Sequence, residues 1–200
     1  MKKKFRNILF AIAVIMGLFN ASCNSKKDVE QTIIKGSGTI EELSIDEKIS
    51  RARYILIGKV TENLPSVWKH QNYKDAQDAT SEEIFDAGGL FTDSFFSVDR
   101  VIKGNIHESS VIRVRTFQGE TKLVRMEMYP EPTYLEGHTY LLMITEGFGP
   151  TSNVDPGYYI SINSDASVYE IIDGKAIALG DEWDYEELVE YIETKVSQRK

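Results

Sequence analysis

The chain has 200 residues, one of them a cysteine, and its 31 acidic and 23 basic residues give a formal net charge of −8. This acidic balance argues against a nucleic-acid partner, because proteins that bind nucleic acids normally present a basic face. A single cysteine cannot form an intramolecular disulfide, whereas the length is sufficient for one domain with its own apolar core.

Residues 1–22 are typical of a signal peptide. A basic start, with Lys2, Lys3, Lys4 and Arg6, precedes twelve apolar residues from Ile8 to Phe19. At about 1.5 Å per residue this run is shorter than the roughly 30 Å core of a bilayer, which favours a cleaved signal over a spanning helix. Cleavage after residue 22 leaves 19 basic and 31 acidic residues, a net charge of −12.

The segment Ala21-Ser22-Cys23 resembles the lipobox of bacterial lipoproteins, which reads leucine-small-small-cysteine, although Asn20 stands where that pattern has leucine. The resemblance implies that Cys23 is lipidated, becomes the first mature residue and anchors an extracytoplasmic protein to a bacterial membrane. Two or three acyl chains such as palmitate hold far more firmly than one. The alternatives are an ordinary secretory signal with a leftover cysteine, or an uncleaved anchor.

Residues 23–43 are polar and contain glycine and serine, which predicts a tether between the lipid and the domain. The alternative is that Ile33 and Ile34 begin a strand. The folded domain is expected to span residues 44–200.

The domain is expected to begin with a short helix, because Ser44 followed by Glu47 fits a capping box. Period-two alternation and β-branched residues predict strands at 54–60, 94–102, 110–117, 122–128, 139–144 and 158–162. Asp173-Gly174 predicts a type I′ turn in a hairpin over 166–179. Asp184, with Glu187 three residues later, predicts the start of an amphipathic helix over 184–198.

In the strand at 139–144, Tyr140, Leu142 and Ile144 share one face, and Leu141 and Met143 share the other, so we expect burial on both faces. The fold class that follows is mainly β, with a short N-terminal helix and a C-terminal amphipathic helix.

The stretches "YILIGKV", "FFSVDRVIKG", "VIRVRTFQG" and "LEGHTYLLMI", over roughly residues 54–145, resemble the OB-fold barrel of netrin domains and tissue inhibitors of metalloproteinases. The resemblance implies an OB-like antiparallel barrel, with Gly104 and Gly119 as turn residues. Those inhibitors chelate the zinc of their target through a mature N-terminal cysteine. Here Cys23 would be acylated and lies far from the first strand, so that mechanism is not expected.

Residues 62–93 are too long for a simple hairpin connection, and long loops in compact domains often carry function. Trp68, Tyr73 and Phe91 in this loop are candidate ligand-stacking residues, because OB-type barrels bind ligands through loops on one side. The alternative is a lid whose aromatic side chains pack on the barrel.

Arg113 and Arg115 share the outer face of the strand at 110–117 and form a candidate anion-binding stripe. The alternative is a solvated sheet face whose charges are balanced by nearby carboxylates.

The three histidines, His70, His107 and His138, lack the close spacing of a zinc site, so we expect neither a metal nor a cofactor. No nucleophile elbow and no phosphate-binding loop is present in the sequence, and we do not expect an enzyme. The sequence therefore predicts a membrane-anchored binding or interaction module whose partner is an envelope protein or a glycan. The alternatives are an envelope hydrolase without a visible site, or an accessory subunit of an envelope complex.

Overall fold

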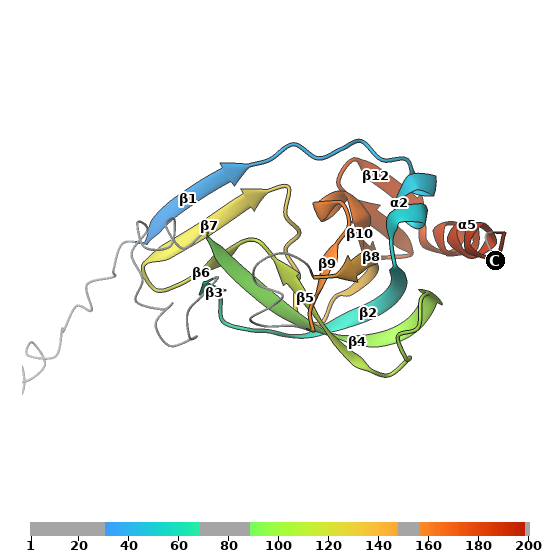
Figure 1. The fold of residues 1–200 in the computed structure, drawn as a ribbon, viewed down its shortest axis with the longest axis horizontal. Coiled ribbons are helices and arrows are strands. Elements are labelled where there is room, and N and C mark those ends of the chain that lie inside the picture. Colours follow the sequence, from blue (N-terminus) through green and yellow to red (C-terminus); the bar gives the residue numbers. More distant parts are fainter. Residues whose placement is uncertain (1–30, 69–88, 148–156, 199–200) are drawn as a thin grey trace, which may run out of the picture. The chain divides into compact units, whose positions relative to one another are not determined.

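The computed structural model describes residues 31–68, 89–147 and 157–198 (Figure 1). The chain divides into two units, Met1–Glu30 and Gln31–Lys200, and the described residues all belong to the second. The predicted signal peptide, the lipidation site Cys23 and the candidate ligand residue Tyr73 lie outside the described residues. None of the helices in the described ranges is long and apolar enough to cross a membrane.

The centre of the domain is a closed barrel of five strands, which confirms the expected mainly β, OB-like fold. Its strands are β2 (Tyr54–Asn63), β4 (Leu90–Lys103), β5 (Val111–Thr116), β8 (Thr139–Glu146) and β9 (Tyr159–Ser161). Strand β2 pairs with β4 and β8, β4 pairs with β5, and β8 pairs with β9, all antiparallel. The parallel pair of β5 and β9, at Val114 and Tyr159, closes the ring.

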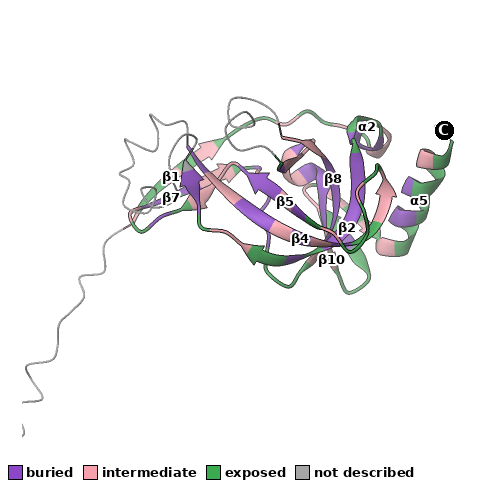
Figure 2. Ribbon diagram, turned by 60° about the horizontal axis from the view of Figure 1, so that its bottom comes forward, coloured by how far each residue is buried: buried purple, intermediate pink, exposed green. Residues whose placement is uncertain are grey.

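The strand faces explain why the barrel closes around an apolar centre. Phe96 of β4 lies opposite Ile112 of β5, and both belong to the interior cluster with Leu142 of β8. The other face of β8, with Leu141 and Met143, packs in a second cluster outside the barrel. The prediction that this strand is buried on both faces is therefore confirmed. Figure 2 shows that burial is concentrated in the barrel strands, whereas α5 carries both buried and exposed residues.

A second layer continues from the outer edge of β8. It contains the short 3-10 turn η1 (Ser164–Ser167) and the strands β10 (Val168–Ile172), β11 (Lys175–Ala178) and β12 (Asp181–Asp184), paired in that order. The turn between β10 and β11 has positive φ at Asp173 (49°) and Gly174 (77°), as a type I′ turn requires, so the predicted hairpin is confirmed.

Two helices belong with this layer. Helix α2 (Ile45–Arg51) begins with the predicted capping box, in which Ser44 and Glu47 bond reciprocally. Helix α5 (Tyr185–Ser197) begins at Asp184, whose carboxylate accepts the N–H groups of Glu186 and Glu187. Both helices contribute buried side chains to the second cluster, including Ile49 and Leu188. The two predicted helices are thus confirmed.

A separate three-stranded sheet contains β1 (Thr32–Ser37), β7 (Val124–Tyr129) and β6 (Gly119–Glu120), with β1 parallel to β7 (Figure 1). The predicted tether over 23–43 is therefore wrong for Thr32–Ser37, and the alternative of a strand at Ile33 and Ile34 is confirmed. The reason is long-range packing, since Ile34 contacts a cluster formed by Leu90, Val124 and Met126.

The predicted loop over 62–93 is shorter than expected. Strand β2 continues to Asn63, β4 begins at Leu90, and between them β3 (Val67–Trp68) pairs with Leu90 and Phe91. Residues 69–88 lie outside the described ranges. Gly104 has the positive φ (99°) of a turn residue, but Gly119 lies in β6, where a Cβ would come within 2.8 Å of Thr92 Oγ1.

Candidate functional site: a pocket at the mouth of the barrel

The interior of the barrel changes from apolar to polar toward one end. Along the inward face of β4 the sequence runs from Phe96 to Ser94 and Thr92, and along β5 it runs from Val114 to Thr116. Thr92 and Thr116 lie directly opposite each other. This end of the barrel therefore presents hydroxyl groups where the middle presents hydrocarbon, which makes it unlike a packed core.

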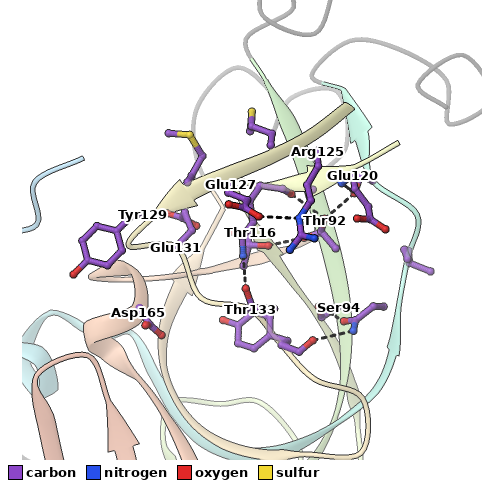
Figure 3. A pocket seen from close by; sticks show the side chains of 18 of the residues that line it. Thr92, Ser94, Thr116, Glu120, Arg125, Glu127, Tyr129, Glu131, Thr133 and Asp165 are labelled. Carbon is purple, nitrogen blue, oxygen red and sulfur yellow. Dashed lines mark hydrogen bonds and ion pairs between the residues drawn. The ribbon is translucent and has the colours of Figure 1, made fainter. Parts of the chain in front are cut away.

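A cavity of about 880 Å³ opens at this polar end, and we call it the barrel-mouth pocket (Figure 3). Its volume is typical of a small-molecule site. Its wall is built from several separate segments, which contribute Asn63, Leu64, Pro65 and Ser66; Thr92, Ser94 and Thr116; Gln118, Gly119 and Glu120; Arg125, Met126, Glu127, Met128 and Tyr129; Pro130, Glu131, Thr133 and Tyr134; and Asp165.

Hydrogen bonds hold the barrel side of the pocket in place. Ser94 Oγ donates to Asn63 Oδ1 at 2.6 Å, and Asn63 Nδ2 donates to the carbonyl of Tyr134 at 2.9 Å. Thr92 Oγ1 donates to the carbonyl of Gln118 at 2.8 Å. These bonds join β2, β4 and the segments before β6 and β8, so the wall is ordered before any ligand arrives.

The opposite side of the pocket is equally restrained. Gln118 Nε2 donates to the carbonyl of Pro132 at 2.7 Å and to Thr133 Oγ1 at 2.9 Å. Both oxygens of Glu131 are engaged, one by the N–H of Phe117 at 3.1 Å and the other by the hydroxyl of Ser164 at 3.0 Å. The carboxylate of Glu131 is therefore fixed in orientation, and no cation among the described residues pairs with it.

One residue that lines the pocket, Tyr134, carries a buried polar group without a hydrogen-bond partner among the described residues. Tyr134 is 5% exposed, and its hydroxyl is the one buried side-chain N or O atom in the described ranges that makes no hydrogen bond. Its ring packs edge-on against Phe96 at 4.9 Å and Tyr140 at 5.4 Å. Leaving a buried hydroxyl unbonded costs about 1–3 kcal/mol, and such groups are rare in folded proteins.

The environment of Tyr134 keeps this hydroxyl protonated. Burial raises its pKa well above 10, and the negative charges of Glu131 and Asp165 raise it further. The hydroxyl can therefore donate one hydrogen bond and accept another at neutral pH.

Asp165 carries a second group that the fold leaves without a partner. Its carboxylate makes no hydrogen bond or ion pair with the described residues, and its backbone N–H donates to the carbonyl of Pro130 at 2.9 Å. Burial raises the pKa of Asp165, and the neighbouring Glu131 and Glu170 carboxylates add to that effect. The folded protein thus places a carboxylate where its charged form is disfavoured.

A smaller cavity of about 370 Å³ lies beside the first, and Glu131, Thr133 and Asp165 line both. Its remaining wall includes Val168, Glu170, Ile177 and Leu179. We call this the side pocket.

The sequence-predicted residues Phe91, Arg113 and Arg115 do come together, but on the opposite face of β4 and β5 from the barrel-mouth pocket. Arg115 Nε and Nη2 donate to the two oxygens of Asp93 at 2.7 and 2.8 Å, and Arg113 lies 3.6 Å from the same carboxylate. The guanidinium of Arg115 lies 4.2 Å from the ring centroid of Tyr158 and 5.5 Å from that of Phe91.

This cluster changes both interpretations of the arginine stripe. Arg115 is 7% exposed, so the alternative of a solvated face is wrong for it, although the balancing carboxylate is present as Asp93. Because Asp93 holds the guanidinium of Arg115 through both oxygens, the geometry does not favour an anion site there. Trp68 contributes its backbone to β3, and Tyr73 lies outside the described residues.

The histidines give no metal centre in the described ranges. His138 pairs with Glu170, and His107 is exposed. No group of three histidine, cysteine or carboxylate side chains comes together there, and His70 lies outside those ranges.

Sequence reasoning missed Tyr134, Glu131 and Asp165. Tyr134 follows a proline-containing stretch, and Asp165 stands in a turn, so neither lies in a motif. Only the closed barrel brings them together.

No protein-family model matches this chain, and a search of curated proteins finds no significant match.

Proposed function

We propose that this protein is a lipid-anchored binding module that holds a small polar ligand in the barrel-mouth pocket. The observation that carries the proposal is the restrained cavity at the polar end of the barrel, whose lining residue Tyr134 has a buried hydroxyl without a hydrogen-bond partner among the described residues. A ligand that exchanged a hydrogen bond with it would offset the cost of that burial.

The position and chemistry of the pocket favour a hydroxyl-rich ligand such as a glycan. OB-fold proteins bind ligands, including oligosaccharides, on the face of their second and third strands, which correspond here to β4 and β5. These strands contribute Thr92, Ser94 and Thr116 to the wall. Hydroxyl and amide groups suit saccharide hydroxyls, and the acidic chain disfavours nucleic acid.

The test of the pocket is a comparison of two tyrosine variants. Isothermal titration of the mature protein with chitotetraose, as the glucosamine and the N-acetylglucosamine oligomer, should detect binding of at least one form. Tyr134→Phe should weaken that binding by about three- to tenfold, the worth of one hydrogen bond, without loss of stability. The control is Tyr159→Phe, a barrel tyrosine that lines neither cavity. Absence of binding by both oligomers, or equal effects of the two variants, would overturn the proposal.

The anchor requires a separate test. Intact mass of the membrane-extracted protein should show a chain that begins at Cys23 and carries diacylglycerol, and Cys23→Ser should block processing. A water-soluble chain with a free thiol at Cys23 would contradict lipidation.

A second candidate function is glycoside hydrolysis, favoured by two carboxylates, Glu131 and Asp165, that line one cavity in different environments. Glycosidases pair an acid of raised pKa with an ionised carboxylate, and burial raises the pKa of Asp165. Release of reducing ends from either oligomer, abolished in Asp165→Asn, would support this candidate. Binding without turnover would exclude it for these substrates.

A further inference from the structure

One wall of the barrel-mouth pocket is formed by a strand that no pairing joins to the barrel. Every residue of β7 from Arg125 to Tyr129 lines the pocket, and Figure 3 shows Arg125, Glu127 and Tyr129 at its edge. The sheet of β7 contains β1 and β6 and shares no strand with the barrel sheet in the described ranges. The position of this wall therefore depends on the neighbours of β7 in its own sheet and on side-chain contacts.

Strand β1 supplies most of the backbone pairing of β7. All six residues of β1 pair with β7, whereas β6 pairs with β7 at two positions. The N–H of Thr32 donates to the carbonyl of Leu123, and the N–H of Gly38 donates to the carbonyl of Tyr129, both at 2.8 Å. Met128 and Tyr129 lie beyond the two β6 pairs, so β1 is the described strand that holds this end of β7.

Few side-chain contacts reinforce the pairing of β1. Four of its six residues are exposed, and Ile34 is the β1 side chain that packs on the small apolar cluster around Leu90. The ion pair of Lys35 with Glu127 joins side chains that are 73% and 38% exposed, and such pairs contribute little to stability. Segments that bury little apolar surface open at a lower free energy than global unfolding requires. Strand β1 is such a segment.

The barrel itself does not depend on β1. The pair of β5 and β9 closes the ring, and the apolar cluster inside the barrel contains no side chain of β1, β6 or β7. Release of β1 would therefore remove the support of the pocket wall and leave the barrel core intact. No residue of β1 lines either cavity, so any effect of β1 on a ligand acts through the position of β7.

We propose that Thr32–Ser37 is a detachable strap that controls the barrel-mouth pocket. With the strap paired, β7 is held in place and the pocket is complete; with the strap released, β7 loses its fixed position and the pocket loses one wall. Only residues 24–31 separate the strap from Cys23, the proposed lipidation site. This inference rests on the proposed function and adds its regulation, because a pull on the anchor acts first on the strap and through it on ligand affinity.

The test compares two proline variants of the mature protein. The N–H groups of Thr32 and Gly38 face β7, so strand alternation directs the N–H of Ile34 to β7 and that of Ile33 to the open edge. In hydrogen-exchange mass spectrometry, Ile34→Pro should speed exchange of the β7 amides at least about tenfold while β2 and β8 stay protected. Ile33→Pro is the matched control and should change β7 little, because its proline removes no ladder bond.

Ligand binding gives the second measurement. The chitotetraose form that binds the unsubstituted protein better should bind Ile34→Pro at least about fivefold more weakly, because the state with a complete pocket is then less populated. Ile33→Pro should bind this oligomer like the unsubstituted protein.

Three outcomes would overturn the inference while leaving the binding module intact. These are unchanged exchange of β7 in Ile34→Pro, an equal loss of protection in β2 and β8, which would make β1 part of the global fold, and unchanged affinity when β7 is released. Failure of the unsubstituted protein to bind either oligomer would instead overturn the proposed function itself. The exchange data would then still decide whether β1 detaches, since they require no ligand.

Discussion

Replacing Asp93 with asparagine should destabilise the domain by about 3 kcal/mol. The Asp93 side chain is 2% exposed and Arg115 is 5% exposed, and two bonds of 2.7 and 2.8 Å join them. Removing one partner of a buried ion pair typically costs about 3–5 kcal/mol, since the other charge stays buried. We place Asp93→Asn at the lower end of this range because Arg115 keeps its cation–π contact with Tyr158.

The assay is equilibrium unfolding in urea, with a double-mutant cycle over Asp93→Asn and Arg115→Met. The double variant should lose less free energy of unfolding than the two single variants together, by about 1.5 kcal/mol or more, because it buries no charge at this pair. Glu41→Gln is the control, since the Glu41–Arg51 pair is also bidentate but exposed, and it should change stability little. Additive effects, or a loss below about 1 kcal/mol in Asp93→Asn, would refute the reasoning.

Three further changes test the pocket and the outer layer. Asp165→Asn should raise the melting temperature at pH 7, because burial raises the pKa of Asp165 and penalises its charged form in the folded state. This gain in melting temperature should vanish as the pH falls toward 3.8, the pKa of the unfolded state, since the carboxyl group is then protonated in both states. Gly119→Ala should cost about 1–3 kcal/mol in urea unfolding, since its Cβ would crowd the Ser66 side chain first and Thr92 Oγ1 next, whereas Gly38→Ala, with open space around it, should not. Lys48→Met should change stability by less than about 1 kcal/mol, because burial lowers the pKa of Lys48 and offsets its attraction to Asp181, and a larger loss by thermal unfolding would contradict this.

Local patterns in the sequence were sufficient to predict the elements whose hydrogen-bond partners are near in the chain. The capping box of Ser44 and Glu47 and the Asp173-Gly174 turn depend on residues within one turn, so their prediction needs no knowledge of the fold. The two-faced burial of β8 also follows from its composition, because every residue from Tyr140 to Ile144 is apolar.

Elements whose partners are distant could not be predicted in this way. Strand β1 lies in a largely polar part of the sequence and pairs in parallel with β7. Ile33 and Ile34 alone were therefore not enough to decide between a tether and a strand. Alternation placed Arg115 on the outer face of its strand, but its burial depends on Asp93 and Tyr158 from other strands. Tyr134 belongs to no sequence motif, and the burial of its hydroxyl depends on the folded barrel.

The closure of the barrel by β9 determines when this chain can fold. Tyr54 pairs with Ile144, and Val114 pairs with Tyr159, so the central strands have no complete set of partners until the last third of the chain is present. Domains dominated by such contacts fold in milliseconds to seconds, far more slowly than helical bundles. Until β9 arrives, β5 and the end of β8 expose unpaired edges, which favour association with other chains. A chain that stops before Tyr159 should therefore aggregate rather than form a smaller barrel.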